Sequence, residues 1–212
     1  SLSVEAGEIL VFAGARDLPS NIRGLGGPGA TKGTSFSVTC ATQAECDSQL
    51  QSYNDFVDRY RARGQSGALQ NPPTDVSVAV GSITFDDDDT DWYFGLDDVG
   101  ISPGQIDFVS VATHELMHVL GFGINFPNSV SAWDRLTVDG TFRGENATAV
   151  YLGEGYPPVE SSHWAASVGS VQPVLMGSSL SGSDRVLLSQ LDMAPMDDIG
   201  WQTVGQSVAI TT

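Results

Sequence analysis

The chain has 212 residues, 41% of them hydrophobic, and its 26 acidic against 9 basic residues give a net charge of −17. This length fits one domain, and this apolar content is enough for a buried core, which argues against wholesale disorder. The negative charge disfavours nucleic acids and anionic membranes as partners, because both repel an acidic surface. No uninterrupted apolar run reaches the about 18 residues of a transmembrane helix, so we expect no membrane span.

Two cysteines, Cys40 and Cys46, flank five residues in the sequence TCATQAEC. Neighbouring cysteines in an acidic chain with a single lysine are typical of a secreted protein with one small disulfide loop. Two buried free thiols or a redox pair are the alternatives, although the spacing differs from the CxxC of redox enzymes. The chain opens at Ser1 without a basic and apolar leader, so we expect that any signal or pro-segment has been removed or never existed. We expect a secreted protein that acts as a monomer.

The first 120 residues alternate between strand and helix signals. Residues 8–13 (EILVFA) predict a strand, and the glycine-rich residues 14–33 predict a long surface loop, because they lack the Gly-Lys-Ser/Thr ending of a phosphate-binding loop. Apolar residues three or four apart predict a helix over residues 45–63, and alternation predicts a strand over residues 76–85. This order of elements indicates a mixed α/β lobe.

An acidic run follows the second strand and comprises Asp86, Asp87, Asp88, Asp89 and Asp91. Clustered carboxylates repel one another without a counter-ion, and oxygen ligands of this kind are those that Ca²⁺ prefers. Asp97 and Asp98 are further candidates for the same site. The run lacks the spacing of an EF-hand, and a solvated acidic loop is the alternative. Calcium therefore stays a candidate cofactor beside that simpler interpretation.

A helix start is predicted at Ser102, with Pro103 at the first helical position and Gln105 completing a capping box. The pattern IDFVSVATHELMHVL continues this helix to Gly121, a residue that commonly ends helices in the left-handed conformation. Beyond Gly121 the chain is rich in Gly, Ser and Pro. We predict one more helix there, over about residues 188–199.

The helix before Gly121 contains the sequence His114-Glu115-Leu116-Met117-His118. Two residues four apart on a helix differ by about 40° in direction and about 6 Å along the axis, so both imidazoles leave the same face. Two nitrogens on one face can bind a single Zn²⁺, and Glu115 flanks the metal as a candidate general base and acid. A chance HExxH is expected in roughly one in a thousand chains of this composition. The alternative is a pair of core histidines on a buried helix.

A catalytic zinc site usually has three protein ligands and one open position. The remaining histidine of the chain, His163, is the favoured third ligand. Glu145 is 27 positions after His118, but the sequence RGENAT around it has no helical pattern of the kind that would present a glutamate ligand. The rival acidic ligands are Asp134, Asp139, Glu145, Glu154 and Glu160.

The sequence HELMHVLGF resembles the active-site helix of the metzincin zinc endopeptidases, with Gly121 three residues after His118. Most metzincins place the third histidine three residues after that glycine, where this chain has Ile124. The chain is most similar to the leishmanolysin-like branch, in which an insertion precedes a third histidine followed by tryptophan, as in His163-Trp164. The segment Val174-Leu175-Met176-Gly177 resembles the methionine turn of the family, and LLSQLDMAPMDDIGW resembles the closing helix of that branch.

The resemblance covers about residues 106–201 and implies an α/β (α+β) metzincin-like domain spanning residues 1–212. Its upper lobe, residues 1–121, would hold a twisted mixed sheet, helices and the zinc-binding helix. Its lower lobe, residues 122–212, would be small and loop-rich, with the insertion, the third ligand, the methionine turn and the closing helix. The edge strand would pair with an extended peptide, and the sequence WYFG is our candidate for it. Met176 would be a structural floor below the zinc, and Ser178 replaces the tyrosine that some relatives use as a further zinc contact.

These observations predict a secreted zinc-dependent endopeptidase that acts on protein or peptide substrates. His114, His118 and His163 are the expected zinc ligands, and Glu115 is the expected catalytic residue. Two alternatives belong to other classes: a zinc-stabilised binding or adhesion domain without catalysis, and a zinc hydrolase of a non-peptide substrate. The intact Glu115 argues against the binding domain, because a structural zinc site has no chemical need for that carboxylate.

Overall fold

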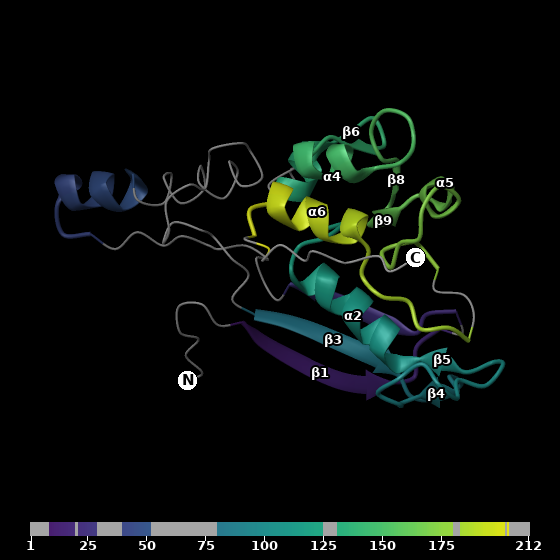
Figure 1. Ribbon diagram of the computed structural model, residues 1–212. Helices are drawn as coiled ribbons and strands as arrows, with labels where there is room; N and C mark the ends of the chain where they lie inside the picture. The colour runs from purple at the N-terminus through teal and green to yellow at the C-terminus, as the bar shows by residue number, and fades with distance from the viewer. Residues whose placement is uncertain are drawn as a thin grey trace.

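A computed structural model describes residues 9–19, 21–28, 40–51, 80–124, 131–179, 183–201 and 203. A three-stranded sheet forms the first part of the fold (Figure 1). Its central strand β3 (Val80–Asp86) is parallel to β1 (Leu10–Arg16) and antiparallel to β2 (Gly24–Pro28), so that β2 lies at an edge of the sheet as far as the described residues go. The fold of the described chain is therefore a mixed α+β fold with small sheets.

Both predicted strands of this part are present, with shifted ends. β1 begins near the predicted start but continues to Arg16, and β3 covers the second half of the predicted range, whose residues 76–79 lie outside the described residues. Ile83 of β3 is buried while its neighbour Ser82 is exposed. That alternation is what a strand with one covered face produces, and it is the signal on which the prediction was based.

The glycine-rich segment is not only a loop, because residues 24–28 form β2 beside the helix α2 (Phe108–Val119). A Cβ atom at Gly24 would lie 2.8 Å from Cγ of Glu115, and one at Gly26 would collide with the backbone carbonyl of Glu115. Glycine is thus required where the helix meets the edge strand. Sequence patterns missed the strand, since glycine lacks the β-branched signature from which strands are predicted.

The start of α2 differs from the prediction. Its N-cap is Asp107, whose carboxylate accepts a hydrogen bond from the Ser110 amide at 2.9 Å. Gln105 does accept from the Ser102 amide at 3.0 Å, as in a capping box, but the two residues enclose a turn instead of starting a helix. Gly104 has a φ of +95°, which interrupts the helical conformation at that point.

The sequence WYFG does not form the edge strand beside the metal-ligand helix. Trp92–Tyr93 is the short strand β4, which pairs in parallel with β5 (Ile106–Asp107) in a separate sheet. The rings of Trp92 and Phe94 instead pack against Phe108, the first residue of α2. The aromatic residues that suggested an exposed pairing strand therefore support the start of this helix.

The end of α2 follows the prediction. Gly121 has a φ of +110°, and its amide donates to the His118 carbonyl while the Phe122 amide donates to the Met117 carbonyl, both at 3.0 Å. These two bonds form a Schellman motif. They fix the carbonyl of Phe122 close to the last turn of the helix.

The second half of the chain surrounds an aromatic core. Trp133, Phe142 and Trp164 are almost completely buried and pack with Phe122, with ring centroids 4.3–6.0 Å apart. Short elements enclose this core: α3 (Ala132–Leu136), β6 (Thr137–Val138), β7 (Thr141–Phe142), α4 (Glu145–Val150), β8 (Val159–Glu160), β9 (His163–Trp164), α5 (Ala166–Gly169) and α6 (Gln190–Asp198). The predicted last helix is confirmed as α6, which packs on α4 (Figure 1).

The helix α4 contradicts our reading of the segment around Glu145 as non-helical. Its first amides are capped by Asp198, which accepts from the backbone amides of Asn146 and Ala147, both at 2.9 Å. Because this cap lies 51 or more residues away in the sequence, no local pattern could have indicated it. None of the described helices combines the length and apolar composition needed to cross a membrane.

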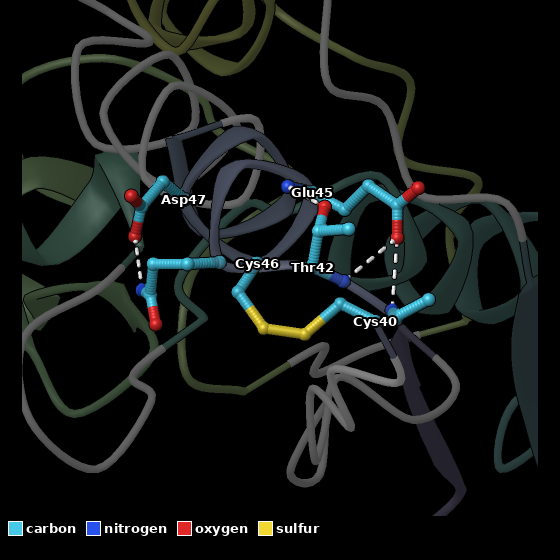
Figure 2. Close-up of a disulfide and its surroundings, with 7 residues drawn as sticks. Cys40, Thr42, Glu45, Cys46 and Asp47 are labelled. Carbon is cyan, nitrogen blue, oxygen red and sulfur yellow. Dashed lines mark hydrogen bonds between the residues drawn. A yellow bond between two sulfur atoms is a disulfide. The ribbon is translucent and has the colours of Figure 1, made fainter.

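The predicted disulfide between Cys40 and Cys46 is present (Figure 2). It spans the start of a helix over residues 43–51, where Glu45 accepts from the Thr42 amide and Thr42 Oγ1 accepts from the Glu45 amide. This is a capping box, placed slightly before the predicted helix start at residue 45. The predicted continuation of the helix over residues 52–63 lies outside the described residues.

The close approach of β2 to α2 predicts different effects for two adjacent glycines. Gly26→Ala should lower the free energy of unfolding by about 1–3 kcal/mol, because its methyl group would overlap the helix backbone. Gly27→Ala should change it by less than about 1 kcal/mol, because no atom lies within 4 Å of the added methyl group. Urea unfolding of both variants checks this pair. Equal stabilities would show that β2 does not pack directly on α2.

Candidate metal centre

Three histidine side chains from two separate elements meet at one point. His114 and His118 lie one turn apart on α2, and His163 is the first residue of β9. Their Nε2 atoms are 3.0, 3.2 and 3.2 Å from one another. Among the described residues they form the one group of three or more His, Cys, Asp or Glu side chains close enough to share a metal ion.

Hydrogen bonds on the far side of two rings determine which nitrogen is unprotonated. Nδ1 of His114 lies 2.9 Å from the Leu175 carbonyl oxygen, and Nδ1 of His118 lies 2.9 Å from the Phe122 carbonyl oxygen. A carbonyl oxygen can only accept, so each Nδ1 carries the proton and each Nε2 keeps its lone pair. These partners orient both rings in the way that carbonyls orient the histidine ligands of zinc proteins.

The converging nitrogens cannot satisfy one another. If His163 donates from its own Nε2, it can serve only one of the two lone pairs on His114 and His118, and the second lone pair remains without a donor in a buried place. A cation satisfies all three nitrogens together. These three nitrogens would together hold a cation such as Zn²⁺, which histidine nitrogens bind at about 2.0–2.1 Å.

Burial keeps these imidazoles neutral. Desolvation is the main cause that lowers the pKa values of His114, His118 and His163 to about 4, against an ordinary value of 6.5. The carbonyl partners of His114 and His118 oppose this shift, and the neighbouring imidazoles add to it. The deprotonated state is the one that binds metal, so the site is ready for an ion at neutral pH.

Backbone pairing brings the third histidine to the helix. The amide of Trp164, the residue after His163, donates to the Met176 carbonyl at 2.9 Å. The same loop supplies the Leu175 carbonyl that holds His114, and Met176 itself is completely buried. The segment predicted as a methionine turn therefore connects two of the three histidines.

Glu115 lies between the helix and the edge strand. Burial raises the pKa of its carboxyl group from 4.5 to about 7, although a hydrogen bond from the Gly26 amide opposes the shift. The nearby Gly24 leaves room for the side chain, since a Cβ there would be 2.8 Å from both Cγ and Oε1 of Glu115. A carboxyl group with this pKa can both accept and donate a proton near neutral pH.

An open cleft of about 590 Å³ gives access to the site. Its lining includes His114, Glu115 and His163, residues 21–25 before and at the start of β2, and residues 177–179 after Met176. A larger cavity of about 900 Å³ lies between α2, α4 and α6, but neither Glu115 nor any of the three histidines lines it. The smaller cleft is therefore the one that contains candidate metal ligands and a carboxyl group that can transfer a proton.

The acidic residues considered above as alternative zinc ligands or as calcium ligands do not belong to this histidine cluster. None of the five acidic rivals joins the histidine group, although Glu160 is paired with His163 across β8 and β9. In the acidic run, Asp86 accepts from the Leu18 amide and from Thr90, and Asp89 pairs with Arg23. Within the described residues, the five aspartates predicted as calcium ligands do not form a group that could hold an ion.

Two supports of the site were missed from the sequence. Asp107, the N-cap of α2, forms a buried ion pair with Arg185, whose Nη2 lies 2.8 Å from Oδ1. Asp192 of α6 accepts hydrogen bonds from the loop and the strand that flank the histidines. Both contacts join residues at least 16 positions apart, so only the tertiary structure reveals them.

The shifted pKa values predict how acid affects the metal-free protein. Each histidine titrates near 6.5 when unfolded and near 4 when folded, so the unfolded chain binds more protons between these values. Glu115 has the opposite effect on stability between pH 4.5 and about 7, because its pKa is higher in the folded chain. The shifts of three histidines outweigh that of one glutamate. The free energy of unfolding should therefore fall as the pH drops from 6.5 to 4.5.

Urea unfolding in the presence of a chelator measures this dependence. A variant with all three histidines replaced by glutamine provides the control, because it keeps every other titrating group. Its stability should fall less over the same pH range than that of the native chain. Parallel pH profiles for the two proteins would contradict the buried, neutral state of the imidazoles.

Comparison with protein-family models, with curated proteins and with solved structures finds no match to this chain. What the chain does must therefore be inferred from its own site. That site is a buried cluster of three histidines able to hold a metal ion, next to a buried glutamate in an open cleft.

Proposed function

We propose that this chain is a secreted zinc-dependent endopeptidase of the metzincin type, nearest the leishmanolysin-like branch. One observation carries the proposal: three Nε2 atoms lie 3.0–3.2 Å apart, and two of these histidines, His114 and His163, line the same open cleft as Glu115. A purely structural metal site would have no use for a neighbouring carboxylate and an opening to solvent. Metal-assisted hydrolysis needs a group that transfers protons and an opening through which the substrate enters.

The donor set favours zinc. Three neutral imidazoles are a ligand set typical of catalytic Zn²⁺ sites, in which three protein ligands would leave one position open for water or substrate. When bound, the ion would supply a Lewis acid that polarises a carbonyl group and increases the acidity of water. The remaining chemistry belongs to side chains of the protein.

Glu115 is the proton carrier in this proposal. It follows His114 directly on α2 and lines the same cleft as His114 and His163, without being one of the ligand group. It accepts a proton from the attacking water and later donates that proton to the amine that leaves when the peptide bond breaks. Its pKa of about 7 suits a group that has to perform both steps near neutral pH.

The edge strand β2 favours a peptide as the substrate. One edge of β2 pairs with β3, and the strand lies at the border of the sheet beside Glu115. An extended peptide can add to such an edge through main-chain hydrogen bonds, which places its carbonyl groups along the cleft. Leu25 of β2 is about half exposed in the cleft lining, where it can contact a substrate side chain.

Secretion is part of the proposal because the disulfide between Cys40 and Cys46 persists in oxidising surroundings. The net charge of −17 is compatible with a freely soluble extracellular protein.

Replacement of Glu115 separates catalysis from metal binding. Glu115→Gln should lower the rate of hydrolysis of unfolded casein at least about 100-fold, because the amide cannot accept the proton. The zinc content should stay near that of the native chain, since Glu115 is not in the ligand group. Casein cleavage and zinc content are measured on the same samples.

Glu160→Gln is the matched control, because this exposed glutamate faces His163 across the β8–β9 pair. It should keep both the zinc and the activity. A native chain that binds zinc but does not cleave casein or other unfolded proteins would contradict the endopeptidase. That result would favour a zinc-stabilised binding domain or a hydrolase of another substrate.

A further inference from the structure

Asp192 is a completely buried carboxylate on α6 that no part of the proposed chemistry uses. Its Oδ1 accepts from the indole Nε1 of Trp164 and from the Met176 amide, both at 3.1 Å. Its Oδ2 accepts from the Leu175 amide at 2.8 Å and from the amide and hydroxyl of Ser189. One side chain thus receives five hydrogen bonds from three separate segments.

These bonds divide into two groups with different roles. The pair from Ser189 belongs to the capping box at the start of α6 and is local to that helix. The other three come from the strand and the loop that surround the histidine cluster, 16 to 28 residues away in the sequence. The bonds from Ser189 alone are sufficient to cap the helix.

The second group leads directly to the metal ligands. Trp164 follows His163, and the Leu175 carbonyl is the acceptor that fixes the ring of His114. We propose that Asp192 is a positioning residue of the metal site, which holds His163 and His114 at the separation that one ion requires. The proposal depends on metal binding by the three histidines and does not depend on peptide hydrolysis.

Both oxygens of the carboxylate are needed for this role. An asparagine at position 192 could accept on one side only, and its NH₂ group would face either the donors Trp164 and Met176 or the donors Leu175 and Ser189. Either orientation leaves buried N–H groups opposed to another donor. One of the two connections to the histidines must therefore loosen.

The negative charge of Asp192 supports the same role. No ion pair joins it to a lysine or arginine among the described residues, so its charge is stabilised by the five donors alone. Burying a carboxylate in this way is costly unless it is fully hydrogen-bonded. A cation held by the adjacent histidines would reduce that cost, which couples metal binding to the carboxylate.

Metal affinity tests the proposal without any assay of hydrolysis. Asp192→Asn should weaken Zn²⁺ binding about 10- to 100-fold, the usual effect of removing a group that orients metal ligands. The dissociation constant is measured by competition with a chromophoric chelator. The visible absorption spectrum of the Co²⁺-loaded protein should also change, because it reports the geometry of the ligands.

Asp198→Asn is the matched control on the same helix. Asp198 is also buried and also caps a distant element, with bonds from Asn146 and Ala147 of α4. Its donors do not belong to the segments around the histidines. The control should lose stability while its Zn²⁺ affinity changes by less than about threefold and its Co²⁺ spectrum stays native.

Equal losses of affinity in the two variants would overturn the proposal, and so would native affinity in a folded Asp192→Asn protein. If that variant does not fold, Trp164→Phe replaces it, since this change removes the indole N–H donor from the strand of His163 while it keeps an aromatic ring in the core. A folded Trp164→Phe protein should bind Zn²⁺ more weakly than the native chain. Unchanged affinity and an unchanged Co²⁺ spectrum in that variant would overturn the proposal.

Discussion

Three imidazole nitrogens converge with at least one lone pair that the rings themselves cannot supply with a donor, and much of the surrounding structure maintains this arrangement. The carbonyls of Leu175 and Phe122 determine the protonation of two rings, and burial keeps all three neutral. Without a cation the cluster is a source of instability, because buried polar groups without partners are costly. The cluster could therefore hold a metal ion.

The fold provides this cluster with two kinds of support. The sheet approaches α2 so closely that Gly24 and Gly26 are required, and this contact puts Glu115 beside the open cleft. The second half of the chain brings His163 to the helix, because the amide of Trp164 in the same strand donates to the Met176 carbonyl. Asp192 joins that strand, that loop and α6. The two halves thus contribute different parts of one site.

Sequence patterns predicted the local parts of this structure and missed the parts that depend on distant contacts. The helix with His114 and His118 was predictable, because its period and its glycine stop are encoded within a few residues. His163 was predictable as the third member of the cluster because the chain has just three histidines. The helix start was wrong, since two capping sequences compete there and the positive φ of Gly104 selects the later one. Similarly, β2 and the hydrogen bonds of Asp192 to Trp164, Leu175 and Met176 depend on packing between segments that no local pattern records.

Zinc X-ray absorption spectroscopy tests the central claim most directly. One equivalent of Zn²⁺ added to the metal-free chain should show three imidazole nitrogens and one further light ligand at about 2.0–2.1 Å, with no sulfur. That result would establish His114, His118 and His163 as the metal site of the described chain. Fewer than three imidazoles in the first coordination shell, or failure to bind one equivalent, would contradict it.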